Sequence, residues 1–174
     1  WRHLNTLFTD LAASQPGDAT LSGDGDPEQP PSRKVTWTFW SVLGTAPLLG
    51  RVFTEDEDNK NVRVVVISYG LWQRRYGSAS DIIGRKISIN DEAYEVIGVM
   101  PRTFYFMPSG EIDLWVPASL PQWMRTNFTW HDSQIVARLK PGVTLQQARQ
   151  AMTSLSLQVT AKDFRGPHAV IVTP

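Results

Sequence analysis

The chain has 174 residues, with 17 lysines and arginines against 17 aspartates and glutamates, so its formal net charge is zero. This balance excludes the broad basic field that nucleic acids and anionic membranes attract, and the absence of cysteine excludes disulfides, iron–sulfur clusters and a cysteine nucleophile. The length suits one domain or two small intertwined lobes, and it is enough to bury a core without a structural metal.

The first predicted element is an amphipathic helix over residues 1–13. Its apolar side chains recur at spacings of three and four residues, and Pro16 with Gly17 would end it: Trp1, Leu4, Leu7, Phe8, Leu11. The chain begins at Trp1 without a methionine, which indicates a fragment excised from a longer protein. No run approaches the roughly 18 apolar residues of a membrane span.

A strand and a loop follow the first element. The strand is expected near Ala19–Ser22, and the loop, rich in glycine and proline, runs from Gly23 to Ser32. A second strand is expected at Lys34–Trp37. Phe39–Leu43 predicts a helical turn that ends at Gly44.

The middle of the chain predicts short helices between strands. Thr54 is expected to cap a helix whose first turn is the acidic run Glu55–Asp58. Val62–Ser68 is a nearly continuous β-branched run, so it predicts a strand buried on both faces. Helices are then expected at Tyr69–Tyr76, ending at Gly77, and at Ser80–Ile83, ending at Gly84.

A hairpin is predicted next, with Asn90-Asp91 as its turn between the strands Lys86–Asn90 and Tyr94–Met100. Another strand is expected at Ile112–Val116, and a further one at Gln134–Lys140. Pro141-Gly142 reads as a turn.

The clearest helix is predicted from Leu145 to about Val159. One apolar stripe runs along it, and Thr144 with Gln147 forms a capping box at its start. Ala169–Thr173 predicts a closing strand. This order of elements indicates an α+β fold, in which the two ends of the chain form halves of one ferredoxin-like (βαβ) lobe and residues 45–122 are inserted as a second lobe.

Catalytic motifs are weak throughout. The three histidines, His3, His131 and His168, form no metal-binding pair. Ser68 follows a strand and precedes a helix, but the glycine of a nucleophile elbow is missing, so a helix cap is the favoured interpretation. A hydrolase built on Ser68 or Ser133 would require a histidine within hydrogen-bond reach.

Metal and nucleotide motifs are equally weak. Asp24, Asp26 and Glu28 alternate in a loop without the geometry of a calcium site, so a plain turn is favoured. No phosphate-binding loop is present, and Arg74-Arg75 is too small a basic spot for nucleic acid. We therefore expect no catalytic, cofactor-binding or metal-binding residue and no cofactor.

A series of motifs resembles the periplasmic core domain of MacB-type or FtsX-like ABC transporter permeases, and is most similar to the acidobacterial duplicated orphan permeases. The motifs cover nearly the whole chain in order: FWSVLGTAPLLGRVF (residues 39–53), VVVISYGLWQRRYG (64–77), IIGRKISINDEAYEVIGVMP (82–101), DLWVP (113–117) and RLKPGVTLQQAR (138–149).

The resemblance implies a discontinuous porter-like lobe, residues 1–44 and 123–174, with a smaller mixed α/β lobe, residues 45–122, inserted. It implies a location at the periplasmic face of the bacterial inner membrane and a role in transport or efflux, coupling cytoplasmic ATP hydrolysis to periplasmic movement without enzymatic activity. The implied partners are the transmembrane helices of the permease, an ATP-binding subunit, a periplasmic adaptor in some members and a second permease copy.

An alternative is a periplasmic sensor module that binds a solute or peptide. Exposed aromatic side chains would form its cleft, and the candidates are Trp123, Phe128 and Trp130.

Overall fold

One mixed β-sheet organises the molecule. The computed structural model describes residues 7–106, 110–121 and 133–160. Within these ranges nine strands form a single sheet in the order β2-β6-β7-β5-β8-β3-β1-β9, and β4 also pairs with β7. The pairs β3–β8 and β5–β7 are parallel and the others are antiparallel. This arrangement confirms the expected α+β class.

Most of the described strands and helices have six residues or fewer. The strands are β1 (Phe8–Pro16), β2 (Leu21–Ser22), β3 (Ser32–Val35), β4 (Leu49–Gly50), β5 (Val64–Ile67), β6 (Lys86–Ile89), β7 (Glu92–Val99), β8 (Leu114–Pro117) and β9 (Gln134–Leu139). The helices are α1 (Phe39–Leu43), α2 (Glu55–Asn59), α3 (Tyr69–Tyr76) and α5 (Leu145–Thr160).

Strand β5 lies at the centre of the sheet and separates two cores. Val64 and Val66 point to one face, among aromatic side chains, while Val65 and Ile67 point to the other, beneath α3. All four side chains are at most 4% exposed. The predicted burial on both faces is therefore confirmed, and it follows from the continuous β-branched run.

The predicted helix over residues 1–13 is wrong where the structure describes it, because Phe8–Pro16 forms strand β1. A bulge between Phe8 and Asp10 shifts the register of β1 against β9. Phe8 and Leu11 consequently both pack with α5, three residues apart, whereas Ala12 faces the aromatic core. The bulged strand thus reproduces the three-residue spacing that is typical of a helix.

Helix starts and ends follow the predicted signals. The Gly44 backbone is left-handed (φ 67°) where α1 ends, and the Gly77 backbone (φ 58°) where α3 ends. Thr54 and Glu57 form a reciprocal capping box on α2, and Thr144 with Gln147 forms another before α5. Each cap satisfies amide groups that the helix itself leaves unpaired.

The two-residue hairpin at Asn90-Asp91 is confirmed. Both residues have positive φ angles, 52° and 63°, and the register Ile89↔Glu92 closes the turn. Asn and Asp tolerate this backbone, and its twist suits antiparallel strands. The helix expected at Ser80–Ile83 is wrong, since this segment forms turns. The strand expected at Ala169–Thr173 lies outside the described residues.

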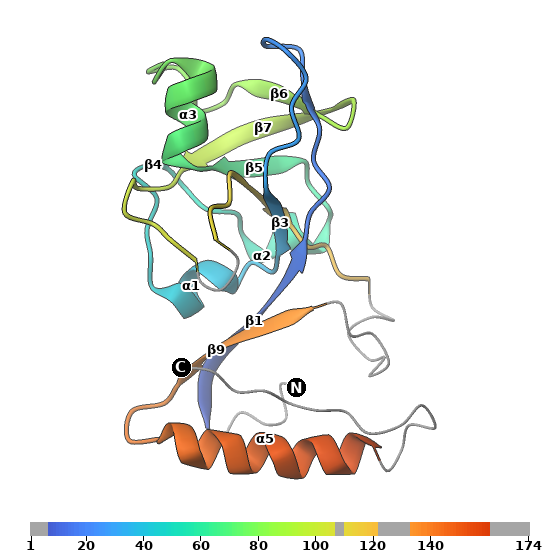
Figure 1. Cartoon of the computed structure of the whole chain (residues 1–174), viewed down its shortest axis with the longest axis vertical. Helices are drawn as coiled ribbons and strands as arrows, with labels where there is room; N and C mark the ends of the chain where they lie inside the picture. Colours follow the sequence, from blue (N-terminus) through green and yellow to red (C-terminus); the bar gives the residue numbers. More distant parts are fainter. Residues whose placement is uncertain (1–6, 107–109, 122–132, 161–174) are drawn as a thin grey trace.

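Strand β1 joins two ends of the molecule (Figure 1). At one end, β1 pairs with β9, and Ala148 and Met152 of α5 pack on this pair. At the other, β1 pairs with β3 through Ser14↔Val35, Gln15↔Lys34 and Pro16↔Arg33. Beyond β3 lie the strands covered by α3.

Candidate functional site

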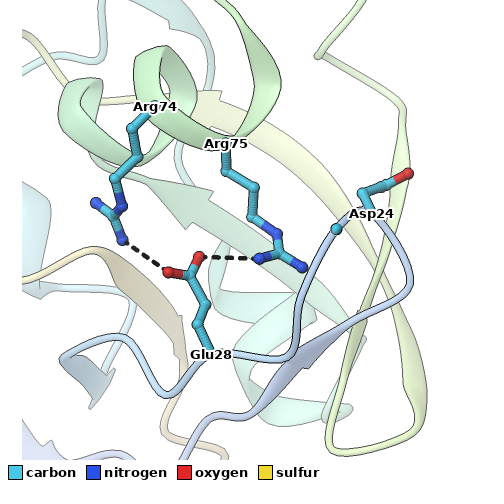
Figure 2. Close-up of a pocket in the computed structure, with 5 residues that line it drawn as sticks. Asp24, Glu28, Arg74 and Arg75 are labelled. Atoms are coloured by element: carbon cyan, nitrogen blue, oxygen red, sulfur yellow. Dashed lines mark hydrogen bonds and ion pairs between the residues drawn. The ribbon is translucent and has the colours of Figure 1, made fainter.

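The polar loop between β2 and β3 closes against α3 over a shallow hollow (Figure 2). The hollow has a volume of about 310 Å³ and is lined by Asp24, Gly25, Glu28, Arg74 and Arg75. Figure 2 shows Glu28 reaching from the loop toward both arginines of the helix. The small basic spot of the sequence therefore lies opposite the acidic loop.

Ion pairs hold the loop on the helix. One carboxylate oxygen of Glu28 lies 3.5 Å from Nη2 of Arg74, and the other lies 3.3 Å from Nη1 of Arg75. Asp24 pairs with Arg85 at 2.9 Å, and Arg75 donates a hydrogen bond to the backbone oxygen of Asp26. These contacts give the side chains of Asp24 and Glu28 cationic partners within the chain.

Arg75 is the most buried charge in the hollow, with a side chain only 9% exposed. Its Nη1 is engaged by the loop, while Nε and Nη2 have no hydrogen-bond partner in the described part of the chain. A buried guanidinium without a carboxylate costs several kcal/mol. Glu28 is therefore the counter-charge on which this packing depends.

Arg74 extends the network to Ser68. It pairs with Asp113 at 2.9 Å, and this hydrogen bond raises the pKa of the Arg74 guanidinium. Asp113 also accepts a 2.6 Å hydrogen bond from Oγ of Ser68. The same Oγ of Ser68 accepts a hydrogen bond from the backbone amide of Leu71. The predicted cap of α3 by Ser68 is confirmed, because its hydroxyl is engaged as both donor and acceptor.

The other predicted candidates do not join this network. Oγ of Ser133 accepts a hydrogen bond from Gln15 at the β1–β9 end. His3, His131 and His168 lie outside the described residues, as do Trp123, Phe128 and Trp130 of the alternative aromatic cleft. No group of three His, Cys, Asp or Glu side chains suited to a metal occurs within the described ranges.

Several tryptophans serve the core. Trp40 and Trp115 are 3% and 2% exposed, and their rings lie 5.9 Å apart in an edge-on contact. Phe39, Phe53, Phe104 and Phe106 complete this aromatic cluster. Such edge-on contacts favour packing of these rings in the core.

One polar residue escaped sequence reasoning. The acidic run Glu55–Asp58 predicts only the first turn of a capped helix, yet Asp58 is just 2% exposed. Its carboxylate accepts backbone amides of Trp37 and Ser119, which lie 21 and 61 residues away in the sequence. No local pattern signals partners at that separation.

Sequence comparison finds related permease proteins. A family model described as the MacB-like periplasmic core domain matches residues 7–155. The macrolide export ATP-binding/permease protein MacB of Chlorobium phaeobacteroides is 27% identical over 122 residues, which is 70% of this chain and 18% of that protein. The chain thus spans less than a fifth of this curated relative.

Solved structures share the fold. The periplasmic region of MacB from Actinobacillus actinomycetemcomitans matches 89% of this chain and 69% of its own, with a TM-score of 0.68 and 16% identity. The extracellular domain of the transporter YknZ from Gram-positive bacteria matches 85% of this chain and 74% of its own (TM-score 0.63, 17% identity). A permease domain from Porphyromonas gingivalis matches 91% of this chain and 66% of its own (TM-score 0.64, 15% identity).

These comparisons agree with the order of motifs in the sequence. In the described part of the chain no helix combines the length and hydropathy needed to cross a membrane. The family description confirms the expected periplasmic location. Because its family model covers residues 7–155, the chain belongs to the MacB-like periplasmic core domains of ABC transporter permeases.

Proposed function

We propose that this domain is a mechanical coupling module. It carries a conformational change, driven by ATP hydrolysis in the cytoplasm, to the periplasmic side of the membrane, and it performs no catalysis itself. Its partners are the transmembrane helices of the permease, an ATP-binding subunit or domain, a second permease copy and, where the transporter uses one, a periplasmic adaptor.

The observation that carries this proposal is the continuity of the sheet. Strand β1 pairs with β9 beneath α5 and with β3 at the edge of the remaining strands, so a displacement of α5 and β9 reaches the rest of the sheet through β1. Hydrogen-bonded strands and close-packed cores resist local deformation, so they move as units. Such a path suits transmission of movement.

The polar hollow supports the same proposal. Both lining carboxylates have arginine partners within the chain, and the Ser68 hydroxyl is engaged in a helix cap. A site for chemistry needs groups with unused capacity that converge on a substrate. The hollow therefore fits a fastening role for the loop better than a reactive one.

We also propose the division into a porter-like lobe, residues 1–44 and 123–174, and an inserted lobe, residues 45–122. The β1–β9 pair and its contact with α5 support the union of the two chain ends. Strands β2 and β3 pair with β6 and β8, so the first segment also contributes to the sheet of the inserted segment.

The proposal is tested by hydrogen exchange in the complete transporter, reconstituted in nanodiscs and compared with ADP and with ATP plus vanadate. We expect trapping with vanadate to change amide exchange in peptides from β1, β9 and α5. A transporter whose ATP-binding component cannot bind ATP is the control. Identical exchange in all states of the functional transporter would rule out coupling through this domain.

A further inference from the structure

Asp58 is a buried carboxylate with two backbone partners. Its Oδ1 accepts the amide of Ser119 at 2.7 Å and its Oδ2 accepts the amide of Trp37 at 3.1 Å. On the same helix, the Asp56 side chain is 69% exposed and pairs with Lys60. A buried carboxylate persists only where hydrogen bonds satisfy it, so the position of Asp58 is set by these two amides.

The two amides lie where the chain leaves two neighbouring parallel strands. Trp37 follows β3 and Ser119 follows β8, and the amide of Ala118 donates to the oxygen of Val35 between them. Ser119 has a φ of 48°, a left-handed backbone that costs free energy for a residue other than glycine. The carboxylate of Asp58 thus fastens both strand exits to α2.

The turn that carries Trp37 is bonded directly to β1. The backbone amide of Thr36 donates a hydrogen bond to the backbone oxygen of Ala13 at 3.0 Å. In return, the backbone amide of Ala13 donates to Oγ1 of Thr36 at 3.0 Å. Oγ1 of Thr38 donates to the oxygen of Leu11 at 2.7 Å. A continuous series of hydrogen bonds therefore runs from α2, through this turn, to β1.

Other links also connect these parts, since Oγ of Ser41 on α1 donates to Asp10 of β1 and Arg138 of β9 donates to the backbone oxygen of Val42. Direct pairing between β1 and β3 is limited to Ser14, Gln15 and Pro16 of β1. Beyond that pairing, β1 pairs with β9 over Phe8 to Ser14, and this pair carries α5. The turn fixed by Asp58 thus lies where the β1–β9–α5 end joins the rest of the sheet.

We propose that Asp58 is a positioning residue for coupling, which holds the β3 turn and the β8 exit in fixed register so that displacement of β1 reaches α2 and the central sheet. This inference rests on the coupling function proposed above. Asp58 acts through two backbone amides, so its role requires an acceptor at both carboxylate oxygens.

The first experiment compares Asp58→Asn with Asp56→Asn in the chain itself. The amide nitrogen of asparagine replaces one acceptor with a donor, so we expect the amide of Trp37 or of Ser119 to exchange roughly tenfold faster or more. In Asp56→Asn, the protection of both amides should stay that of the unsubstituted chain. Equal protection in both variants overturns the clamp.

If Asp58→Asn fails to fold, a second measurement decides. A scalar coupling across the hydrogen bond between the Ser119 amide nitrogen and the Asp58 carboxyl carbon is measured by NMR in the unsubstituted chain. Detection of this coupling supports the clamp, and a Ser119 amide that lacks it and exchanges freely overturns it.

The second experiment places the same pair of variants in the complete transporter. With ATP plus vanadate, we expect the Asp58→Asn transporter to keep its exchange response in β9 and α5, and in β3, which stays paired with β1, and to show a smaller response in β8 and α2. Responses identical to those of Asp56→Asn overturn the positioning role. A missing response in the unsubstituted transporter instead overturns the coupling function, so the two failures are distinguishable.

Discussion

Gly98 of β7 lies in close contact with the backbone at the end of β4. A Cβ atom at Gly98 would lie 2.3 Å from the backbone oxygen of Arg51, where β4 pairs with β7. That atom belongs to the backbone, so a rotamer change cannot relieve the overlap. Glycine is therefore required at this position for contact between the two strands.

We expect Gly98→Ala to lower the free energy of unfolding by about 1–3 kcal/mol because the strands must separate. The matched control is Gly70→Ala on α3, where the nearest atom to a Cβ is 3.7 Å away. Alanine should stabilise that helix by about 0.5–1 kcal/mol. Urea unfolding of both variants checks the sign, and equal effects would contradict the predicted overlap.

Glu57 makes stability depend on pH. Arg51 donates hydrogen bonds to its carboxylate at 2.7 and 2.8 Å, and these bonds, aided by the Thr54 amide, lower the pKa of Glu57 from 4.5 to about 2. The folded state thus favours the ionised carboxylate. The stability that this preference contributes is present above about pH 4.5 and is lost as the pH falls toward about 2.

We expect Glu57→Gln to flatten the acid side of the stability curve over this pH range, because glutamine does not titrate. Thermal unfolding at a series of pH values is the measurement, and Glu55→Gln, exposed on the same helix, is the control. If Glu57→Gln and the unsubstituted chain lose stability in parallel, the Arg51 pair does not set this dependence.

The cap of α3 is a property of the element. Ser68 accepts the amide of Leu71 at 2.9 Å, and we expect Ser68→Ala to cost about 1 kcal/mol of stability through loss of this cap. Ser68→Thr should retain much of the cap, since threonine is also a helix cap and keeps the hydroxyl that donates to Asp113. Chemical denaturation compares the three proteins. An undiminished stability in Ser68→Ala would contradict the assignment.

The loop over α3 depends on the Glu28 carboxylate. Glu28→Gln leaves the buried guanidinium of Arg75 without its counter-charge, so we expect a loss of about 1–3 kcal/mol and faster amide exchange in residues 23–28. The control is Glu92→Gln, which breaks the exposed pair with Arg63 and should cost less than about 1 kcal/mol. Equal costs would show that the loop is not held by this pair.

Local signals predicted some elements and misled on others. Helix α3, the Asn90-Asp91 hairpin and the start of α5 follow from caps and turns encoded within a few residues. Strand β1 does not, because its bulge imitates helical spacing and its partners β3 and β9 lie far along the chain. The burial of Asp58 was equally hidden, since its two partners belong to distant turns.

At the scale of the whole molecule, the order of motifs predicted the family, while the sequence could not show how the ends connect. The arrangement of β1 between β3 and β9 places α5 and α3 at opposite ends of the molecule (Figure 1). A coupling module must move one end when the other is displaced. A change in the distance between these two helices during the ATP cycle therefore reports whether movement passes through the domain.

The most direct test measures that distance. The chain has no cysteine, so spin labels can be attached through Gln73→Cys on α3 and Gln150→Cys on α5, both exposed positions, in a complete transporter otherwise free of cysteine. Pulsed electron resonance then compares ADP with ATP plus vanadate. We expect the distance distribution to shift on trapping, and a distribution that is the same in both states would contradict mechanical coupling through this domain.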